Sequence, residues 1–303
     1  MTQIKQSDVL GFGYAVVDEL LFVDSYPHPD TKTVVNERII AVGGLTATAL
    51  IAASRLGGRC AYAGVLGPDA DSRSILDVLE EEGIDACHVR QLADARPACS
   101  AIIVDTSRKT RTILYDKSSA VGPSAAMIDP ELVHSTRVLF VDHHGIEGMT
   151  RAADLARRAG IPVVGDFERV DVIGLDGLMA LVDHLIVPVH FAREITNESN
   201  PRDAVVALLP GREVAVVTCG ADGGWYAGPN TGGPEPYDVF AVDAVDTTGC
   251  GDVFHGAYAW ALATGHDVTS RIRYAAAAAA LKATAAGGHR AIPDRAAVEQ
   301  QMA

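Results

Sequence analysis

The sequence predicts an α/β protein with a central, mostly parallel sheet that carries helices on both faces. Two observations carry this prediction. From Arg137 onward, short runs rich in Val, Ile and Leu alternate with segments of helical pattern, which is typical of βαβ units. Apolar residues make up 48% of the 303 residues, ample for one core, and no linker, repeat or low-complexity tract divides the chain. We therefore expect a single domain over residues 1–303.

The charge and the cysteine content narrow the classes of function. A formal net charge of −14 argues against nucleic acid or an anionic membrane as the main partner. Five cysteines, an odd number without a Cys-x-x-Cys spacing, predict neither a disulfide framework nor a zinc site. The polar N-terminus does not look like a signal peptide, and no apolar run reaches the length that spans a bilayer. The expected location is the cytoplasm.

The first predicted element is a buried strand over Val9–Val17. Its glycines, Gly11 and Gly13, do not form a dinucleotide-binding fingerprint, because a third glycine is missing and no helix follows directly. Asp18 comes just after the carboxyl end of this strand, where open α/β sheets bind ligands. A carboxylate there can accept two hydroxyl groups of a ligand, or it serves only as a turn or cap residue. The residues alone leave both interpretations open.

Two hairpins are predicted outside the strand–helix alternation. Residues 20–23 and 33–40 flank a turn rich in Pro and Asp, and residues 99–105 and 110–116 flank a second polar turn. We expect these strands, within about 19–41 and 98–117, to project from the main sheet as a small lid. The alternative is a pair of edge strands on the main sheet.

Glycines mark the start of the first predicted helix. Gly43 and Gly44 end a strand, and a helical segment follows through Gly57. The two glycines either bring the backbone close to a ligand or form only a tight turn. A strand over 62–67 and a helix that runs to Glu82, with Gly83 as its C-cap glycine, come next.

The second half of the chain supplies the regular alternation. Strands are predicted over 138–142, 163–166 and 184–188, with helices over 151–159 and 175–181 between them. Parallel strands joined in this way are buried on both faces. The expected sheet is therefore parallel, with helices on both of its faces.

Polar residues follow two of these strands. Asp142, His143 and His144 end the first one; because neighbouring residues of a strand point to opposite faces, one zinc ion cannot easily bind both histidines. A pocket role for His144 or Glu147 is one interpretation, and ordinary loop polarity is the other. Asp166 ends the next strand, and either reaches a nucleotide-bound metal through water or caps the following segment.

The stretch Asp246–Asp252 joins a strand-like run to a long apolar helix through a glycine turn. The first N–H groups of a helix lack internal partners, and with the helix dipole they make an anion site. Gly249 and Gly251 leave room for a phosphate to approach the backbone. Asp252 is either a base that takes a proton from an attacking hydroxyl or a helix N-cap.

The order Asp-Thr-Thr-Gly-Cys-Gly-Asp over residues 246–252 resembles the C-terminal signature of the PfkB/ribokinase family of carbohydrate kinases, usually Asp-Thr-x-Gly-Ala-Gly-Asp. Cys250 replaces the usual Ala, another small residue. The resemblance implies a ribokinase-like fold with a small β lid over the sugar. It also implies that Asp252 is the catalytic base, and that the amides of Gly249, Cys250 and Gly251 hold charge on the transferred phosphoryl group.

The same resemblance assigns roles to further residues. The substrate-binding set is Asp18, Gly43, Gly44 and Thr48, where Thr48 stands in place of the usual Asn. The nucleotide-binding set is Thr218, Gly220, Gly223, Lys282 and Gly287. Glu194 matches half of an Asn-x-x-Glu motif that holds Mg²⁺ through water, although Phe191 occupies the Asn position. Asp246 and Thr248 resemble part of a site for a monovalent cation, K⁺.

The expected activity is that of an ATP-dependent sugar kinase that uses Mg²⁺, with a ketohexose or a ketohexose derivative as the acceptor. A ribose or nucleoside kinase of the same fold is the alternative, and a non-catalytic sugar- or nucleotide-binding regulator is a third interpretation. Basic residues of the lid region, among them Arg111 and Lys117, either accept an anionic group on the sugar or are solvated. A homodimer through the β lid is also predicted.

Overall fold

The computed structural model describes residues 5–229 and 231–303. Eight strands form the main sheet in the order β14-β13-β12-β11-β10-β9-β1-β4. Their bounds are β1 Ser7–Phe12, β4 Cys60–Tyr62, β9 Thr136–Val141, β10 Val163–Asp166, β11 His184–Pro188, β12 Val214–Thr218, β13 Gly224–Ala227 and β14 Glu235–Tyr237. The strands from β4 to β12 pair in parallel, and β13 and β14 add an antiparallel edge. The predicted parallel α/β fold is confirmed.

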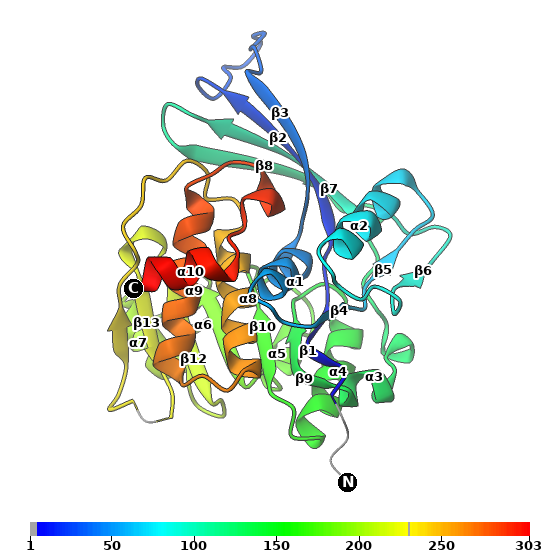
Figure 1. Cartoon of the computed structure of the whole chain (residues 1–303), viewed down its shortest axis with the longest axis vertical. Helices are drawn as coiled ribbons and strands as arrows, with labels where there is room; N and C mark the ends of the chain where they lie inside the picture. The colour runs from blue at the N-terminus through cyan, green and yellow to red at the C-terminus, as the bar shows by residue number, and fades with distance from the viewer. Residues whose placement is uncertain (1–4, 230) are drawn as a thin grey trace.

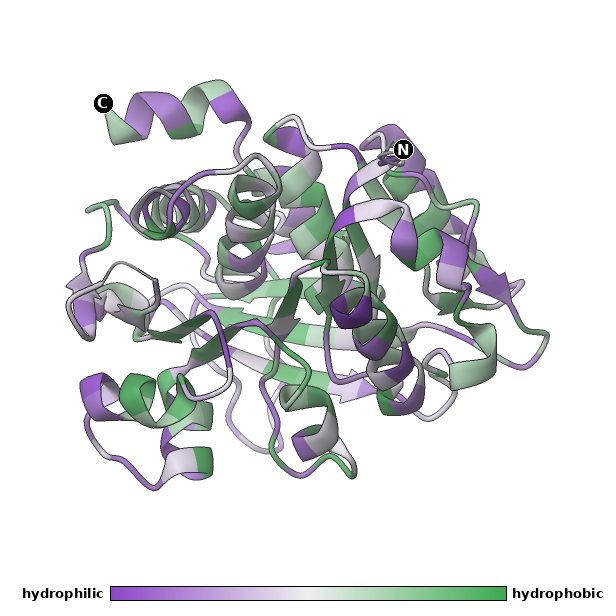
Figure 2. Ribbon diagram, turned by 90° about the horizontal axis from the view of Figure 1, so that it is seen from below, coloured by the Kyte–Doolittle hydropathy of each residue, from purple (hydrophilic) through white to green (hydrophobic). Residues whose placement is uncertain are grey.

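Helices cover both faces of this sheet, because successive strand residues alternate between two apolar cores. On one face Val138 and Phe140 join the core formed with α1 (Leu45–Arg55), α8 (Cys250–Ala263) and α9 (Val268–Ala283). On the other face Leu139 and Val141 join the core that holds α3 Pro130–His134, α4 Ile146–Arg158, α5 Leu175–Met179, α6 Val189–Thr196 and α7 Pro201–Leu208. Figure 2 shows the hydrophobic strands between the two helical layers.

Smaller elements fill the periphery. Helix α10 (Arg295–Met302) packs on α9, and α2 (Ala70–Glu81) packs beside β2 and β3, two strands of a separate four-stranded sheet described below. A short pair of parallel strands and three 3₁₀ turns complete the part of the chain that the structure describes: β5 Val65–Leu66, β6 Arg90–Gln91, η1 Ala125–Met127, η2 Gly220–Asp222 and η3 Gly288–Ala291. No helix in the described part of the chain has both the length and the apolar character needed to cross a membrane.

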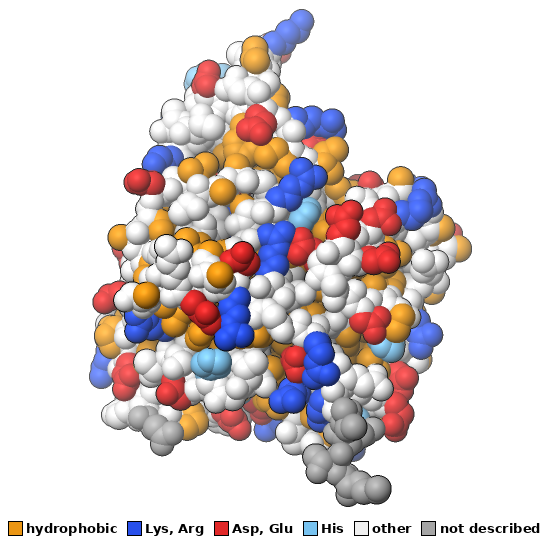
Figure 3. Space-filling model, in the orientation of Figure 1, with side chains coloured by type: hydrophobic (Ala, Val, Ile, Leu, Met, Phe, Trp, Pro, Cys, Tyr) orange, Lys and Arg blue, Asp and Glu red, His pale blue; other side chains and the backbone are white. Residues whose placement is uncertain are grey.

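Four strands form a separate sheet, the lid, in the order β3-β2-β7-β8. Their bounds are β2 Val16–Val23, β3 Glu37–Gly43, β7 Ala98–Asp105 and β8 Thr110–Asp116. The lid rises above the main sheet in Figure 1, so the alternative of edge strands is wrong. Exposed apolar side chains lie on the lid and on the loop between β2 and β3, among them Ile40, Leu114 and Val34, and Figure 3 shows hydrophobic atoms gathered in this region.

The predicted strand Val9–Val17 is wrong, since the chain leaves the main sheet after Phe12 and enters the lid at Val16. Long-range hydrogen bonds fix the crossing: the Tyr62 hydroxyl donates to the Gly13 carbonyl (2.9 Å), and the Tyr14 amide donates to Asp142 Oδ2 (2.7 Å). Asp18 therefore lies within a lid strand. A second predicted strand, 62–67, is divided at Gly64, where a Cβ atom would come within 1.9 Å of the Tyr62 hydroxyl oxygen.

Candidate active site

A cavity of about 770 Å³ lies between the lid and the main sheet, at the end of the sheet where α8 begins. Open α/β sheets bind ligands at such a position. The lid contributes Asp18, Ser100 and Arg111 to its wall, and the start of α8 contributes Gly251 and Asp252. Residues far apart in the sequence thus meet around one space.

Asp252 lines this cavity from the first turn of α8. The N-cap position is taken by Gly249, with φ of 77°, and the helix carries no side-chain cap. Asp252 is therefore not the cap that one interpretation of the sequence allowed. Its carboxylate stands beside the first amides of the helix, which have no partner inside the helix and favour an anion.

The electrostatics around Asp252 suit a proton acceptor. Burial, together with the nearby carboxylates of Glu168 and Asp18, holds the pKa of Asp252 well above its usual range, and the Arg111 guanidinium opposes the shift. Raising the pKa of a carboxylate toward neutrality makes it a better general base. Burial also raises the pKa of Glu168.

Glu168 is a cavity residue that the sequence analysis missed. It comes two residues after the end of β10, on the edge of the sheet where Asp166 had already been noticed. That position was the available signal. Asp166 itself is buried at 2% exposure and is not part of the cavity wall, so the structure does not support its contact with a metal.

Asp166 instead belongs to a buried group behind Asp252. Its Oδ2 lies 3.3 Å from His255 Nδ1. The same imidazole ring places Nδ1 2.8 Å from the Gly251 carbonyl and Nε2 2.9 Å from the Ile186 carbonyl of β11. His255 therefore ties the first turn of α8 to the sheet. Burial lowers the pKa of His255, against the two carbonyl contacts.

On the lid side of the cavity, Asp18 is held by Ser100, whose hydroxyl donates to Asp18 Oδ1. Gly43 makes room for this carboxylate, because a Cβ atom at residue 43 would lie 1.9 Å from Asp18 Oδ2. Gly44 lines the cavity with φ of 95°, a conformation that glycine adopts without strain. Burial raises the pKa of Asp18, with Ser100 opposing the rise.

Thr48 does not line the cavity, and the expectation that it contacts the substrate is corrected. Thr48 lies inside α1 at 4% exposure. Its methyl carbon is 3.5 Å from the point where a Cβ atom on Gly249 would lie. Thr48 packs the turn before α8 rather than reaching the ligand. Ser100, which the sequence analysis missed, comes instead from a strand of the second hairpin.

His143 and His144 both line the cavity. The strand-alternation argument does not apply to them, because β9 ends at Val141. Asp142 fixes their loop by accepting hydrogen bonds from the Tyr14 amide (2.7 Å), the Thr46 hydroxyl (2.8 Å) and the His144 amide (2.7 Å).

The imidazole of His144 stacks on the Tyr14 ring, with centroids 3.3 Å apart. Burial lowers the pKa of His144 to about 3 and that of His143 to about 4, so both rings are neutral near pH 7. Neutral imidazoles both donate and accept hydrogen bonds, which suits hydroxyl-bearing ligands. Glu147 is exposed and lies outside the cavity wall.

The predicted nucleotide residues lie at the end of β12. Thr218 is half-buried, and Gly220 is exposed with no atom within 4 Å of an ideal Cβ. Residue 223 has to be glycine for a packing reason, because a Cβ atom there would lie 2.1 Å from the Tyr237 carbonyl oxygen. None of the three lines the 770 Å³ cavity.

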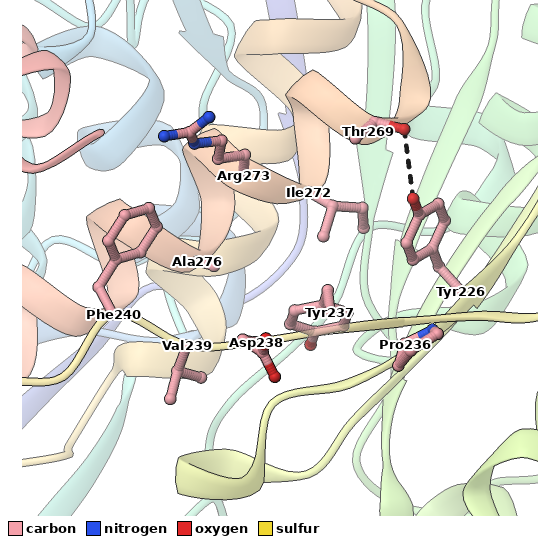
Figure 4. A pocket seen from close by; sticks show the side chains of 10 residues that line it. All are labelled: Tyr226, Pro236, Tyr237, Asp238, Val239, Phe240, Thr269, Ile272, Arg273 and Ala276. Atoms are coloured by element: carbon pink, nitrogen blue, oxygen red, sulfur yellow. Dashed lines mark hydrogen bonds between the residues drawn. The ribbon is translucent and has the colours of Figure 1, made fainter. Parts of the chain in front are cut away.

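A smaller cavity of about 320 Å³ lies between β14 and α9 and shares no wall residue with the first. Figure 4 shows Phe240 and Tyr237 facing the helix residues Ile272 and Ala276 across it. The Tyr226 hydroxyl lies 3.2 Å from that of Thr269. This smaller cavity lies along the first half of α9, and Asp252 is not in its wall.

The structure does not bring Glu194 to the large cavity. Its side chain is exposed on α6, and only His190 of that helix belongs to the cavity wall. The water-mediated magnesium contact of Glu194 stays a prediction, and Glu194 would have to make it from outside this cavity wall. Glu168 lines the cavity together with Asp252 and raises the pKa of that carboxyl, and carboxylate oxygens are donors that Mg²⁺ favours.

Lys282 and Gly287, which are predicted to bind the nucleotide, are both buried. The Lys282 side chain is fully buried, and its Nζ lies 3.8 Å from Asp246 Oδ2. Gly287 is buried before η3 with φ of 121°.

Burial raises the pKa of Cys250, the first residue of α8, to about 11, and the Lys282 ammonium opposes this rise.

Comparison with known proteins agrees with this geometry. The sequence model described as "pfkB family carbohydrate kinase" matches residues 6–295. A ribokinase of Haemophilus influenzae is 27% identical over 289 residues, with 92% of each chain covered. A putative ribokinase from Agrobacterium tumefaciens superposes with a TM-score of 0.88 at 30% identity, covering 97% of this chain and 96% of that one. A putative ribokinase II from E. coli, solved in complex with ATP and Mg²⁺, gives a TM-score of 0.83 at 20% identity, with 99% of each chain covered.

Proposed function

The chain belongs to the pfkB family of carbohydrate kinases, and from this premise we propose that it transfers the γ-phosphoryl group of ATP to a primary hydroxyl of a small sugar, with Asp252 as the general base. The observation that carries the proposal is the half-buried carboxylate of Asp252. It lines the cavity in the first turn of α8, where Asp252 Oδ2 lies 3.8 Å from the ideal Cβ position of Gly249.

Each group around the cavity takes one task. Asp252 accepts the proton of the attacking hydroxyl, and its raised pKa brings it closer to the pH of the reaction. The amides of Gly249, Cys250 and Gly251 donate to the oxygens of the transferred phosphoryl group, where charge is spread. Asp18, oriented by Ser100, accepts hydroxyls of the sugar and directs the reacting one toward Asp252.

The chain's own donors fit a magnesium ion carried in with ATP. Glu168 is the carboxylate we assign to it, directly or through water, and the bound ion would neutralise charge on the phosphates. The ATP complex of the E. coli relative supports both ligands. We place the nucleotide along the end of β12, where Thr218 and the open surface of Gly220 are accessible.

The lid excludes water from the transfer. Its inner face carries a small core of Leu20, Phe22 and Ile102, continuous with the strand that holds Asp18. Water kept out of the cavity cannot compete with the sugar as the nucleophile.

The exposed apolar residues of the lid support the proposal that two copies of the chain pair through the lid.

A ketohexose, or a ketohexose derivative, is our first choice of acceptor, since the neutral His143 and His144 line the wall and Lys117 offers a cation to an acidic substituent. Ribose is the second choice, because the Haemophilus influenzae relative is a ribokinase.

The test is ADP release with the purified protein over a panel of fructose, ribose, sulfonated and phosphorylated sugars and nucleosides. Sugar-dependent ADP release is expected from one class. Release by nucleosides alone, or by none of these compounds, would contradict the proposal.

A further inference from the structure

Three buried polar atoms beside the active site have no hydrogen-bond partner among the described residues: Asp246 Oδ2, Thr248 Oγ1 and Lys282 Nζ. They lie together. Lys282 Nζ is 3.8 Å from Asp246 Oδ2, and the Thr248 amide donates to Asp246 Oδ1 at 2.9 Å. Buried polar atoms normally have partners, so a cluster of three without them has a specific cause.

The backbone shows why Lys282 meets this loop. The amides of Val245 and Asp246 both donate to the Ala283 carbonyl, at 2.7 and 3.1 Å. The C-terminal end of α9 is thereby fixed against the loop that precedes α8. Lys282 occupies the last turn of α9, where the helix dipole favours a cation. It carries the single charged side chain in a helical run otherwise made of alanine and leucine from Ala275 to Ala283.

The donor set does not fit the monovalent cation that the sequence resemblance predicted at Asp246 and Thr248. A K⁺ ion needs oxygen ligands, whereas an ammonium group has three donors and no lone pair to offer. A second positive charge beside the fully buried Nζ would also be repelled in a medium that screens it weakly. Lys282 already brings one positive charge to Asp246.

We propose that the Lys282 ammonium takes the place of a monovalent cation, and that this kinase therefore works without K⁺. The ammonium neutralises Asp246, whose other oxygen holds the Thr248 amide one residue before the Gly249 cap of α8. Lys282 is a positioning residue: it fixes the loop that aims the first amides of α8 at the phosphoryl group.

The first test needs only the unmodified protein, and compares KCl with tetramethylammonium chloride at equal ionic strength. We expect kcat to agree within about twofold, and the midpoint of thermal unfolding to be the same in both salts because no ion binds the folded state. Stimulation of kcat by K⁺ of about tenfold or more, or a K⁺-specific rise in the midpoint, would overturn the proposal.

The second test compares Lys282→Ala with Lys282→Met. Removing the charge leaves Asp246 buried and unpaired, so kcat without K⁺ is expected to fall about tenfold or more in both variants. The alanine variant leaves space for an ion, and K⁺ should raise both its kcat and its unfolding midpoint. The methionine side chain fills that space, so K⁺ should change neither. A folded alanine variant with full kcat in tetramethylammonium would show that Lys282 only packs.

The kinase readout rests on the proposed function, but the thermal readout needs neither sugar nor ATP. If no acceptor is found, the proposed function fails while the midpoint comparison still decides the role of Lys282. If neither variant folds, the comparison of salts on the unmodified protein decides it.

Discussion

Replacing Gly43 by Ala tests how closely the lid positions the sugar. Gly43 does not have a positive φ, so the backbone accepts an alanine. The new Cβ atom would lie 1.9 Å from Asp18 Oδ2, and real contacts of a Cβ atom are not shorter than 3.0 Å. The carboxylate must therefore move by roughly 1 Å, which is easy for the end of a side chain but changes the site. We expect a folded enzyme with a displaced Asp18.

The size of the effect follows from this displacement. A misplacement of about 1 Å at a positioning group costs on the order of 100-fold in rate, or about 2.7 kcal/mol of transition-state stabilisation. We expect kcat/KM for the sugar to fall by that factor while KM for ATP is unchanged, measured by coupled ADP release at varied sugar and varied ATP.

The matched control is Gly177→Ala, in α5, where no atom lies within 4 Å of the new Cβ. It should leave kcat/KM as it is. The reasoning is refuted if Gly43→Ala keeps full kcat/KM for the sugar, or if it raises KM for ATP equally.

Three further predictions concern charge and burial. Glu168→Gln removes the negative charge that raises the pKa of Asp252, so the pKa of Asp252 should fall. Because kcat/KM is lost at low pH when this base becomes protonated, the acid limb of the pH profile should move to lower pH. Asp142→Asn places an NH₂ group against one of two backbone N–H donors and should lower the free energy of unfolding in urea by about 1–3 kcal/mol. With its pKa raised to about 11, Cys250 has a thiolate fraction of about a thousandth at pH 8, so iodoacetamide should label the exposed Cys87 long before it.

Matched carboxylates serve as controls for the first two of these. Glu147→Gln, on the exposed first turn of α4, should leave the pH profile in place. Asp77→Asn, exposed on α2, should not change the free energy of unfolding. A profile that stays fixed in Glu168→Gln, or moves to higher pH, contradicts the assigned charge coupling. Labelling of Cys250 at the rate of Cys87 contradicts its burial.

The sequence predicted the second half of the fold better than the first, for a physical reason. Val163–Asp166 and His184–Pro188 are strands with the bounds predicted, because each is a short apolar run between polar turns. Val9–Val17 read as one strand because its residues are continuously apolar. The crossing into the lid depends on Tyr62 and Asp142, which lie far away in the chain.

The candidate site divides in the same way. Local motifs predicted Asp252 and the glycines before it, and they line the cavity or begin its helix. Ser100 reaches the cavity only through the packing of the lid, which no local pattern contains. Glu168 follows β10 by two residues, a local signal, but only the order of the strands brings it beside Asp252. The family resemblance assigned Lys282 to the nucleotide, whereas its ion pair with Asp246 depends on the packing of α9 against the loop before α8.

The most direct measurement of the central claim is kcat of Asp252→Asn, with ATP affinity measured on the same preparation. Asparagine keeps the shape of the side chain but cannot accept the proton of the sugar hydroxyl. We predict that kcat falls by about three orders of magnitude while the Kd for ATP stays within roughly threefold. A kcat close to that of the unmodified enzyme would contradict the assignment of Asp252 as the base.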